Sequence, residues 1–139
     1  MPQLRKDPVT KRWVIILHEQ AKTPADFQIP QPPRQQNKCP FCPGHEDMAP
    51  PEVMSYRTPE TLPNQPGWAV RVIPNKFPAL QIEGDLDRTG IGVYDMMNGV
   101  GAHEVIIESP NHDDGFHNYT VEQISRILRT YTDRYRDLR

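Results

Sequence analysis

The sequence predicts an α+β fold in which an antiparallel sheet carries one packed helix. Three short segments, residues 13–17, 68–73 and 102–108, are rich in the β-branched and aromatic residues typical of strands. The segment after residue 120 instead has apolar residues three and four positions apart, the spacing of a long helix.

The chain has 139 residues, about the length of one domain. Its 16 basic and 18 acidic residues leave a formal net charge of −2, whereas proteins that bind the nucleic-acid backbone usually carry a basic excess. The apolar runs are too short to span a membrane, and the first residues lack the apolar segment of a signal peptide. Nucleic-acid binding, membrane insertion and secretion are therefore disfavoured, and we expect a cytoplasmic protein.

Proline is unusually frequent, and 13 of the 16 prolines lie between Pro24 and Pro78. Proline lacks a backbone donor and fixes φ, so this region cannot hold long helices. A disordered linker is one interpretation. The same region also contains cysteine, tryptophan, phenylalanine and valine residues, so we predict an irregular but packed structure.

The strands are predicted in order along the chain. Residues 13–17 follow a turn-like segment over 7–11 and do not alternate in polarity, which favours a first strand buried on both faces. Residues 18–38 have the composition of a loop. Residues 68–73 alternate in side-chain size and polarity, which predicts a half-exposed second strand. The third strand, 102–108, ends at a Ser-Pro pair.

The helix is the clearest element. Thr120 is a typical N-cap residue, and Gln123 has the offset that completes a capping box. The apolar pattern reaches Arg139 without a Gly, Asn or Pro that closes a helix, so we expect a chain cut from a longer protein. One apolar face is predicted from six residues: Val121, Ile124, Leu128, Tyr131, Tyr135 and Leu138.

Cys39 and Cys42 form a Cys-x-x-Cys motif and are the only cysteines in the sequence. A structural disulfide fits poorly in a chain without a secretion signal. A redox pair would open a helix, but Pro43 and Gly44 follow at once. Two thiolates on a tight turn suit a zinc knuckle better, and such a site needs two further ligands. By spacing alone, His45, His103 and His112 all remain candidates, whereas His117 has the setting of a solvated loop residue.

Five segments in order resemble galactose-1-phosphate uridylyltransferase, over essentially the whole chain. They are LRKDPVTKRWVI at 4–15, CPFCPGHED at 39–47, PPE at 50–52, GWAVRVIPNKFPAL at 67–80 and GAHEVIIESPNH at 101–112. The resemblance implies a histidine-triad-like half with a zinc knuckle, in an enzyme that exchanges hexose 1-phosphates on UDP-glucose and usually forms homodimers.

In this family, a histidine attacks the α-phosphorus of UDP-glucose and forms a uridylyl-histidine intermediate, which is covalent catalysis of a double displacement. The nucleophile is the second histidine of a His-Pro-His motif, and the sequence contains no such motif. We therefore expect residues 1–139 to be the N-terminal domain of the enzyme, with no catalytic residue of its own and no activity alone.

The resemblance also assigns a ligand set. It implies that a structural zinc ion takes Cys39, Cys42 and His112, with a fourth ligand from the first histidine of His-Pro-His. His103 then has no metal role.

Four residues correspond to substrate contacts in the family. Asn75 and Lys76 match a pair that touches the nucleotide sugar. Gln20 and Thr23 stand where two arginines normally meet the phosphates, and neutral side chains cannot make charge-assisted bidentate bonds. A related branch transfers adenylyl from ADP-glucose, so the base remains open. The alternative function is a non-catalytic, zinc-stabilised module that binds nucleotide sugars or a protein.

Overall fold

The computed structural model of the protein describes residues 2–16 and 39–139. The chain divides into two compact units, one formed by Met1–Arg34 with Phe77–His103 and the other by Gln35–Lys76 with Glu104–Arg139. The predicted loop over 18–38 lies outside the described residues.

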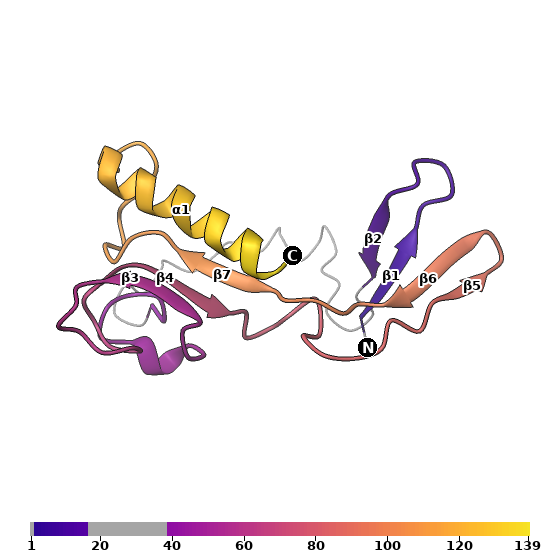
Figure 1. The fold of residues 1–139 in the computed structure, drawn as a ribbon, viewed down its shortest axis with the longest axis horizontal. Helices are drawn as coiled ribbons and strands as arrows, with labels where there is room; N and C mark the ends of the chain where they lie inside the picture. Colours follow the sequence, from indigo (N-terminus) through magenta and orange to yellow (C-terminus); the bar gives the residue numbers. More distant parts are fainter. Residues whose placement is uncertain (1, 17–38) are drawn as a thin grey trace, which may run out of the picture. The chain divides into compact units, whose positions relative to one another are not determined.

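The first unit contains a four-stranded antiparallel sheet in the order β2-β1-β6-β5 (Figure 1). Its strands are β1 (Gln3–Lys6), β2 (Trp13–Ile16), β5 (Thr89–Ile91) and β6 (Tyr94–Asn98). Asp7 builds the turn between β1 and β2, because its Oδ1 atom accepts from the backbone N–H groups of Val9 at 2.7 Å and Thr10 at 2.9 Å. The predicted turn is therefore confirmed, and so is the first strand over residues 13–16, while residue 17 lies outside the described residues.

The predicted burial of this first strand is wrong. Trp13, Val14 and Ile15 are 41%, 47% and 44% exposed. β2 is an edge strand of its sheet, paired only with β1 among the described strands, so its apolar run is not enclosed on both sides.

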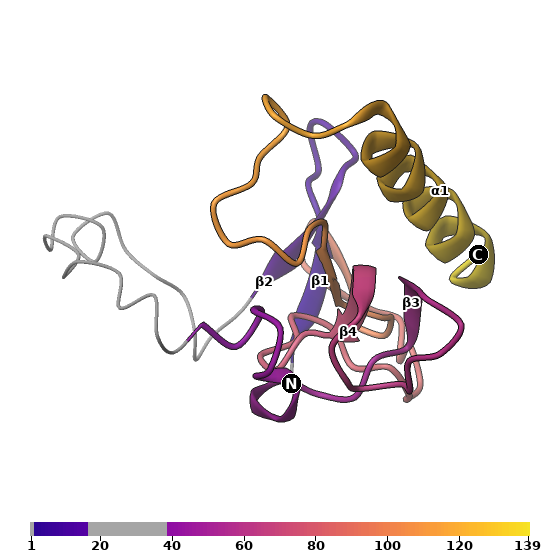
Figure 2. The same ribbon diagram turned by 90° about the vertical axis from the view of Figure 1, so that its left-hand side faces the viewer.

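The second unit contains a three-stranded antiparallel sheet in the order β3-β4-β7, with α1 against it (Figure 2). Its elements are β3 (Met54–Arg57), β4 (Trp68–Pro74), β7 (Glu104–Ile107), α1 (Val121–Asp137) and the short 3-10 helix η3 (Glu46–Met48). Within this unit, α1 lies on one side of the sheet and η3 on the other, as Figure 1 shows. The prediction of antiparallel strands with one packed helix is confirmed, in two sheets rather than one.

β4 forms the centre of the second unit. Trp68, Val70, Val72 and Ile73 are all at most 3% exposed. β4 is hydrogen-bonded to β3 on one edge and β7 on the other, and elements cover both faces, so the prediction of a half-exposed strand is wrong. Arg71, in the middle of this strand, is only 1% exposed.

α1 begins where the sequence predicts. The Thr120 hydroxyl accepts from the backbone N–H of Gln123 at 3.2 Å, which confirms the N-cap. The other half of the predicted capping box is wrong, because the Gln123 Oε1 atom accepts from Arg126 at 3.2 Å and not from the backbone N–H of Thr120. The Gln123 Nε2 atom donates to the backbone carbonyls of Ala69, at 2.8 Å, and Glu108.

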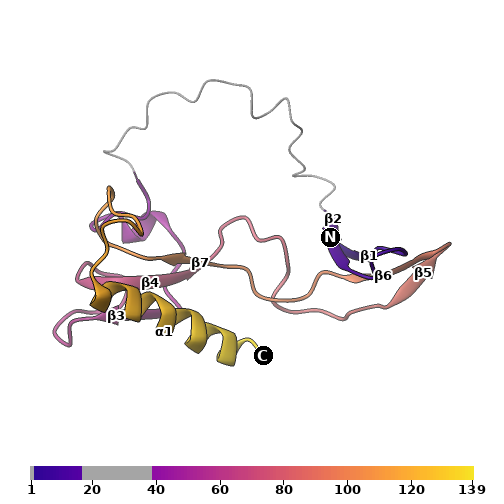
Figure 3. The ribbon, with the colours of Figure 1, turned by 90° about the horizontal axis from the view of Figure 1, so that it is seen from above.

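The face of α1 that meets the sheet is not the predicted apolar one. Ile127 and Thr130 are buried, whereas Val121, Leu128 and Tyr135 are 79%, 54% and 68% exposed. At 3.6 residues per turn, the buried stripe lies roughly 100° around the helix from the apolar stripe. Figure 3 shows α1 running along the sheet of its unit.

Polar contacts from α1 to the strands explain this rotation. Arg134 donates to both carboxylate oxygens of Glu104 in β7, each at 2.7 Å. Asp133 accepts from the Tyr56 hydroxyl of β3 at 2.9 Å. Together with Gln123, these residues bond to the sheet, so the side of the helix on which they lie faces it.

Candidate metal centre

The two cysteines lie on a tight turn that leads into η3. The backbone N–H of Cys42 donates to the carbonyl of Cys39 at 3.3 Å, and that of His45 donates to the carbonyl of Cys42 at 3.1 Å. Gly44 has φ +89°, which side-chain-bearing residues rarely adopt. The turn therefore brings both thiols to one side, and the two cysteines are not joined in a disulfide.

His112 comes from a separate turn that follows β7. Asp114 organises this turn: its Oδ2 atom accepts from the Ser109 hydroxyl at 2.7 Å, and its Oδ1 atom from the Asn111 side chain at 2.8 Å. The Ser109 hydroxyl in turn accepts from the backbone N–H of Asn111 at 3.1 Å. These bonds fix the backbone next to His112 and direct its ring toward the cysteines.

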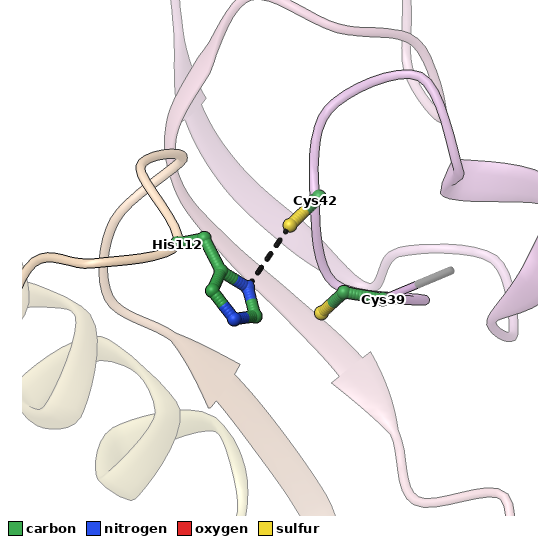
Figure 4. A group of neighbouring side chains, drawn as sticks. All are labelled: Cys39, Cys42 and His112. Carbon is green, nitrogen blue, oxygen red and sulfur yellow. Dashed lines mark hydrogen bonds between the residues drawn. The ribbon is translucent and has the colours of Figure 1, made fainter. Parts of the chain in front are cut away.

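Cys39, Cys42 and His112 meet at one point, with one ligand atom of each within 4.8 Å of the others (Figure 4). The Nδ1 atom of His112 lies 3.3 Å from the Sγ atom of Cys42. Burial, followed by a hydrogen bond between the Cys42 thiol and Cys39, raises the pKa of Cys42. Two thiols and an imidazole are the donor types that zinc prefers, so the residues fit such an ion.

Within residues 2–16 and 39–139, this is the one group of three or more His, Cys, Asp or Glu side chains with that spacing. The Nδ1 atom of His45 lies 2.9 Å from the carbonyl oxygen of Cys39 instead. The Nδ1 atom of His103 accepts from the backbone N–H of Ala79 at 2.9 Å, and His103 precedes β7 rather than lying within the predicted strand. His117 is exposed, as predicted. The group borders a hollow of about 320 Å³.

The sequence patterns did not reveal the role of Glu46, which is the first residue of η3 and follows the turn that carries Cys39 and Cys42. Its residue exposure is 5%. One carboxylate oxygen accepts from the backbone N–H of Gly44 and the other from the indole N–H of Trp68, both at 2.9 Å. No local pattern marks this role, because Trp68 lies 22 residues further along the chain.

Two of the predicted substrate contacts, Asn75 and Lys76, do not lie beside Cys39, Cys42 and His112. Asn75 and Lys76 follow the end of β4, where Pro74 pairs with Glu104. His112 follows the opposite end of β7, so the length of β7, about 10 Å from Glu104 to Ile107 at 3.3 Å per residue, separates the two places. Asn75 is half-buried and Lys76 is exposed. Gln20 and Thr23 lie outside the described residues.

Fold and site together define an α+β chain built on antiparallel sheets, with a Cys-x-x-Cys turn facing a histidine. The profile of the family described as galactose-1-phosphate uridyl transferase, N-terminal domain, matches residues 1–139. The chain belongs to this family, which confirms the resemblance seen in the sequence.

Similar proteins include an ADP-glucose phosphorylase of Arabidopsis thaliana, which is 40% identical over 138 residues. The match covers 96% of this chain and 38% of that protein, so the chain spans well under half the length of this relative. None of the described helices is long and apolar enough to cross a membrane.

Solved structures of similar proteins also match this chain. The crystal structure of an ADP-glucose phosphorylase from Arabidopsis thaliana, with bound ADP-glucose, matches at 34% identity and a TM-score of 0.52, covering 99% of this chain and 38% of that one. A galactose-1-phosphate uridylyltransferase-like protein from the same plant matches at 35% identity and a TM-score of 0.54, covering 96% and 35%. A uridylyltransferase at 24% identity and a TM-score of 0.58, covering 97% and 34%, shares the fold.

Proposed function

We propose that this chain is the N-terminal part of a nucleotidyltransferase that moves a nucleotidyl group from a nucleotide sugar to a phosphate-bearing acceptor. The observation that carries this proposal is the family match over residues 1–139. The nucleophilic histidine would lie in a His-Pro-His motif outside this sequence. Covalent capture of the nucleotidyl group there divides one difficult exchange into two displacements.

The first candidate activity is that of a UDP-glucose:hexose-1-phosphate uridylyltransferase of galactose metabolism, acting as a homodimer. The second is transfer from ADP-glucose. Its support is the relative named ADP-glucose phosphorylase, together with the neutral Gln20 and Thr23 where the family has arginines.

Intact-mass measurement tests both candidates. The protein that carries this chain is incubated with UDP-glucose or ADP-glucose, and the mass increase identifies a uridylyl or an adenylyl adduct. Residues 1–139 alone should gain no adduct from either donor. If the longer protein binds a nucleotide sugar but forms no adduct, the non-catalytic binding module replaces the enzyme.

The proposed substrate contacts are Asn75 and Lys76, with Gln20 and Thr23 near the phosphates. Their support is the match to family positions. An Asn amide can bond a ribose or phosphate oxygen, and a lysine adds a charge. In the same assay, Asn75→Ala should raise the donor concentration needed for half-maximal labelling, and an unchanged value would remove Asn75 from the site.

The metal proposal is a structural zinc ion held by Cys39, Cys42 and His112, with a fourth ligand from elsewhere in the protein. When bound, zinc would tie the knuckle to the turn after β7. Metal binding that depends on folded ligands stabilises the folded state.

His112→Ala should therefore weaken zinc binding and remove most of the zinc-dependent rise in melting temperature. His117→Ala is the matched control, because His117 is an exposed histidine of the same connecting segment. Native mass spectrometry and thermal melts with and without zinc provide the two readouts. Equal zinc retention by both variants would contradict the ligand assignment.

A further inference from the structure

We propose that Glu46 is a positioning residue that holds the Cys39–Cys42 turn in its metal-binding shape before any metal arrives. The proposal rests on the zinc site proposed above. Glu46 does not belong to the group of ligands, since the described cluster consists of Cys39, Cys42 and His112. Glu46 would act on the metal ligands indirectly, through the backbone of the turn that carries Cys39 and Cys42.

The Glu46 carboxylate joins the knuckle to the sheet. One oxygen accepts from the N–H of Gly44, two residues past Cys42, and the other accepts from the indole of Trp68 at the start of β4. Each bond is 2.9 Å long, and both carboxylate oxygens are used. A buried carboxylate needs such donors, because an unsatisfied buried charge is strongly unfavourable.

At its other end, this link is attached to the buried core. Trp68 is 3% exposed and belongs to the buried core with Ile73 and Ile107. Arg71, also in β4, donates to the backbone carbonyl of Glu46 at 3.4 Å, a long contact that adds a second link. Glu46 therefore fixes the position of Gly44, at the end of the turn that carries Cys39 and Cys42, relative to β4.

A fixed knuckle should raise metal affinity, because a flexible one must be ordered when the ion binds. With Glu46 in place, this ordering occurs during folding. Residues that orient the metal ligands without binding the metal themselves typically change metal affinity by about 10–100-fold when they are removed. Glu46 is suited to this role because its two bonds act on the turn itself.

The test compares Glu46→Gln with Asp47→Asn. Glutamine keeps the size of Glu46 but turns an amide NH₂ toward one of two N–H donors, so one bond is lost. Asp47 is the next residue in η3 and is exposed, so its variant makes the same charge change without touching the knuckle. Zinc affinity is measured by competition with a chromogenic chelator, at a temperature where circular dichroism shows both variants folded.

We expect Glu46→Gln to bind zinc about 10–100-fold more weakly than the unsubstituted protein, with Asp47→Asn unchanged. The thiolate-to-metal absorption of the Co²⁺ form should shift or broaden in Glu46→Gln alone. An unchanged zinc affinity in Glu46→Gln overturns the positioning role and leaves the zinc site standing. If the unsubstituted protein binds no zinc, both proposals are overturned.

If the Glu46→Gln variant does not fold, a measurement on the unsubstituted protein tests the proposal instead. In the metal-free, unsubstituted protein, the backbone N–H of Gly44 should already be protected from hydrogen exchange, because Glu46 accepts from it. An unprotected Gly44 N–H that becomes protected only when zinc is added would overturn the proposal.

Discussion

Arg71 is a charged side chain in the centre of the second unit's sheet, and its partners show how the fold accommodates it. Its Nε atom lies 3.2 Å from Glu52 Oε2, and Arg57 donates to both oxygens of Glu52 at 2.6 and 2.7 Å. The side chains of Arg71, Glu52 and Arg57 are 1%, 5% and 12% exposed. Removing one member of such a group leaves the others buried and incompletely paired.

Arg71→Met should therefore lower the free energy of unfolding by about 3–5 kcal/mol, the usual cost of breaking a buried ion pair. Urea denaturation measures this change. Arg88→Met is the matched control because Arg88 is exposed, and it should change stability by less than about 0.5 kcal/mol. Equal effects of the two substitutions would contradict the buried network.

Tyr131 gives a second prediction at the residue scale. Its hydroxyl donates to Glu108, and this bond, with burial as the second cause, raises the tyrosine pKa to about 12. A raised pKa means that folding favours the neutral phenol. The contribution of Tyr131 to stability is thus complete below its unfolded pKa of about 10 and is lost as the pH rises through about 12.

In Tyr131→Phe, the alkaline loss of stability between about pH 10 and 12 should be smaller than in the unsubstituted protein. Tyr135→Phe, on the exposed side of the same helix, is the control. Chemical denaturation across this pH range measures the effect. A tyrosine titration by ultraviolet absorbance that is unchanged in Tyr131→Phe above about pH 11 would contradict the shifted pKa.

At the scale of elements, α1 shows what local sequence can determine. Its start at Thr120 was predicted because capping and spacing are local signals, whereas its end at Asp137 comes two residues before the predicted apolar pattern stops. Its orientation was not predicted, because Gln123, Asp133 and Arg134 bond residues in or directly after the strands, between 15 and 77 positions away. The apolar pattern alone indicated the wrong side of the helix.

Two neighbouring residues test this orientation. Ile127 is 0% exposed and Leu128 is 54% exposed. Ile127→Ala should reduce the free energy of unfolding by about 2–5 kcal/mol, as for other buried large-to-small substitutions. Leu128→Ala should cost less than about 1 kcal/mol. The reverse order, in urea denaturation, would place the predicted apolar face against the sheet.

The strands were predicted where composition is distinctive. The apolar runs that became β2, β4 and β7 were found, whereas β1, β3, β5 and β6 were not. Those four read QLRK, MSYR, TGI and YDMMN, which are short and contain no apolar run of the kind that marks the other three strands. The burial of β2 and β4 was misjudged because burial depends on a strand's place in the sheet.

For the molecule as a whole, the buried apolar side chains of the described residues belong to one of the two units. Trp68, Val70, Val72, Ile73, Ile107 and Ile127 all lie in the unit of Gln35–Lys76 and Glu104–Arg139. Regions with little buried apolar surface open locally at lower free energy than a packed core.

Backbone amides in β4 and β7 should therefore exchange with deuterium more slowly than those in β1 and β6. Hydrogen exchange followed by mass spectrometry, on the protein as purified, gives the comparison. Equal protection of the two sheets would show that the first unit is held by contacts beyond those within its own sheet.

The metal group was predictable in part at this scale. The Cys-x-x-Cys spacing indicated two ligands, but the choice of His112 over His45 and His103 came from the family resemblance and not from spacing. His112 lies on the turn after β7, and the cysteines lie on a turn that Glu46 links to β4. Because β4 and β7 are paired, the two turns bring His112 to the cysteines. Asp114 and Glu46 build those turns, and neither residue carries a pattern that distinguishes it from an ordinary surface acid.

The network of Glu52, Arg57 and Arg71 also has an evolutionary consequence. A lineage that replaces Arg71 alone passes through a protein with an underpaired buried carboxylate, so single steps away from this arrangement are disfavoured. The positions should therefore vary together among relatives: where Arg71 becomes apolar, Glu52 should become neutral as well. Relatives that keep Glu52 while losing both arginines would show that some other cation has taken their place.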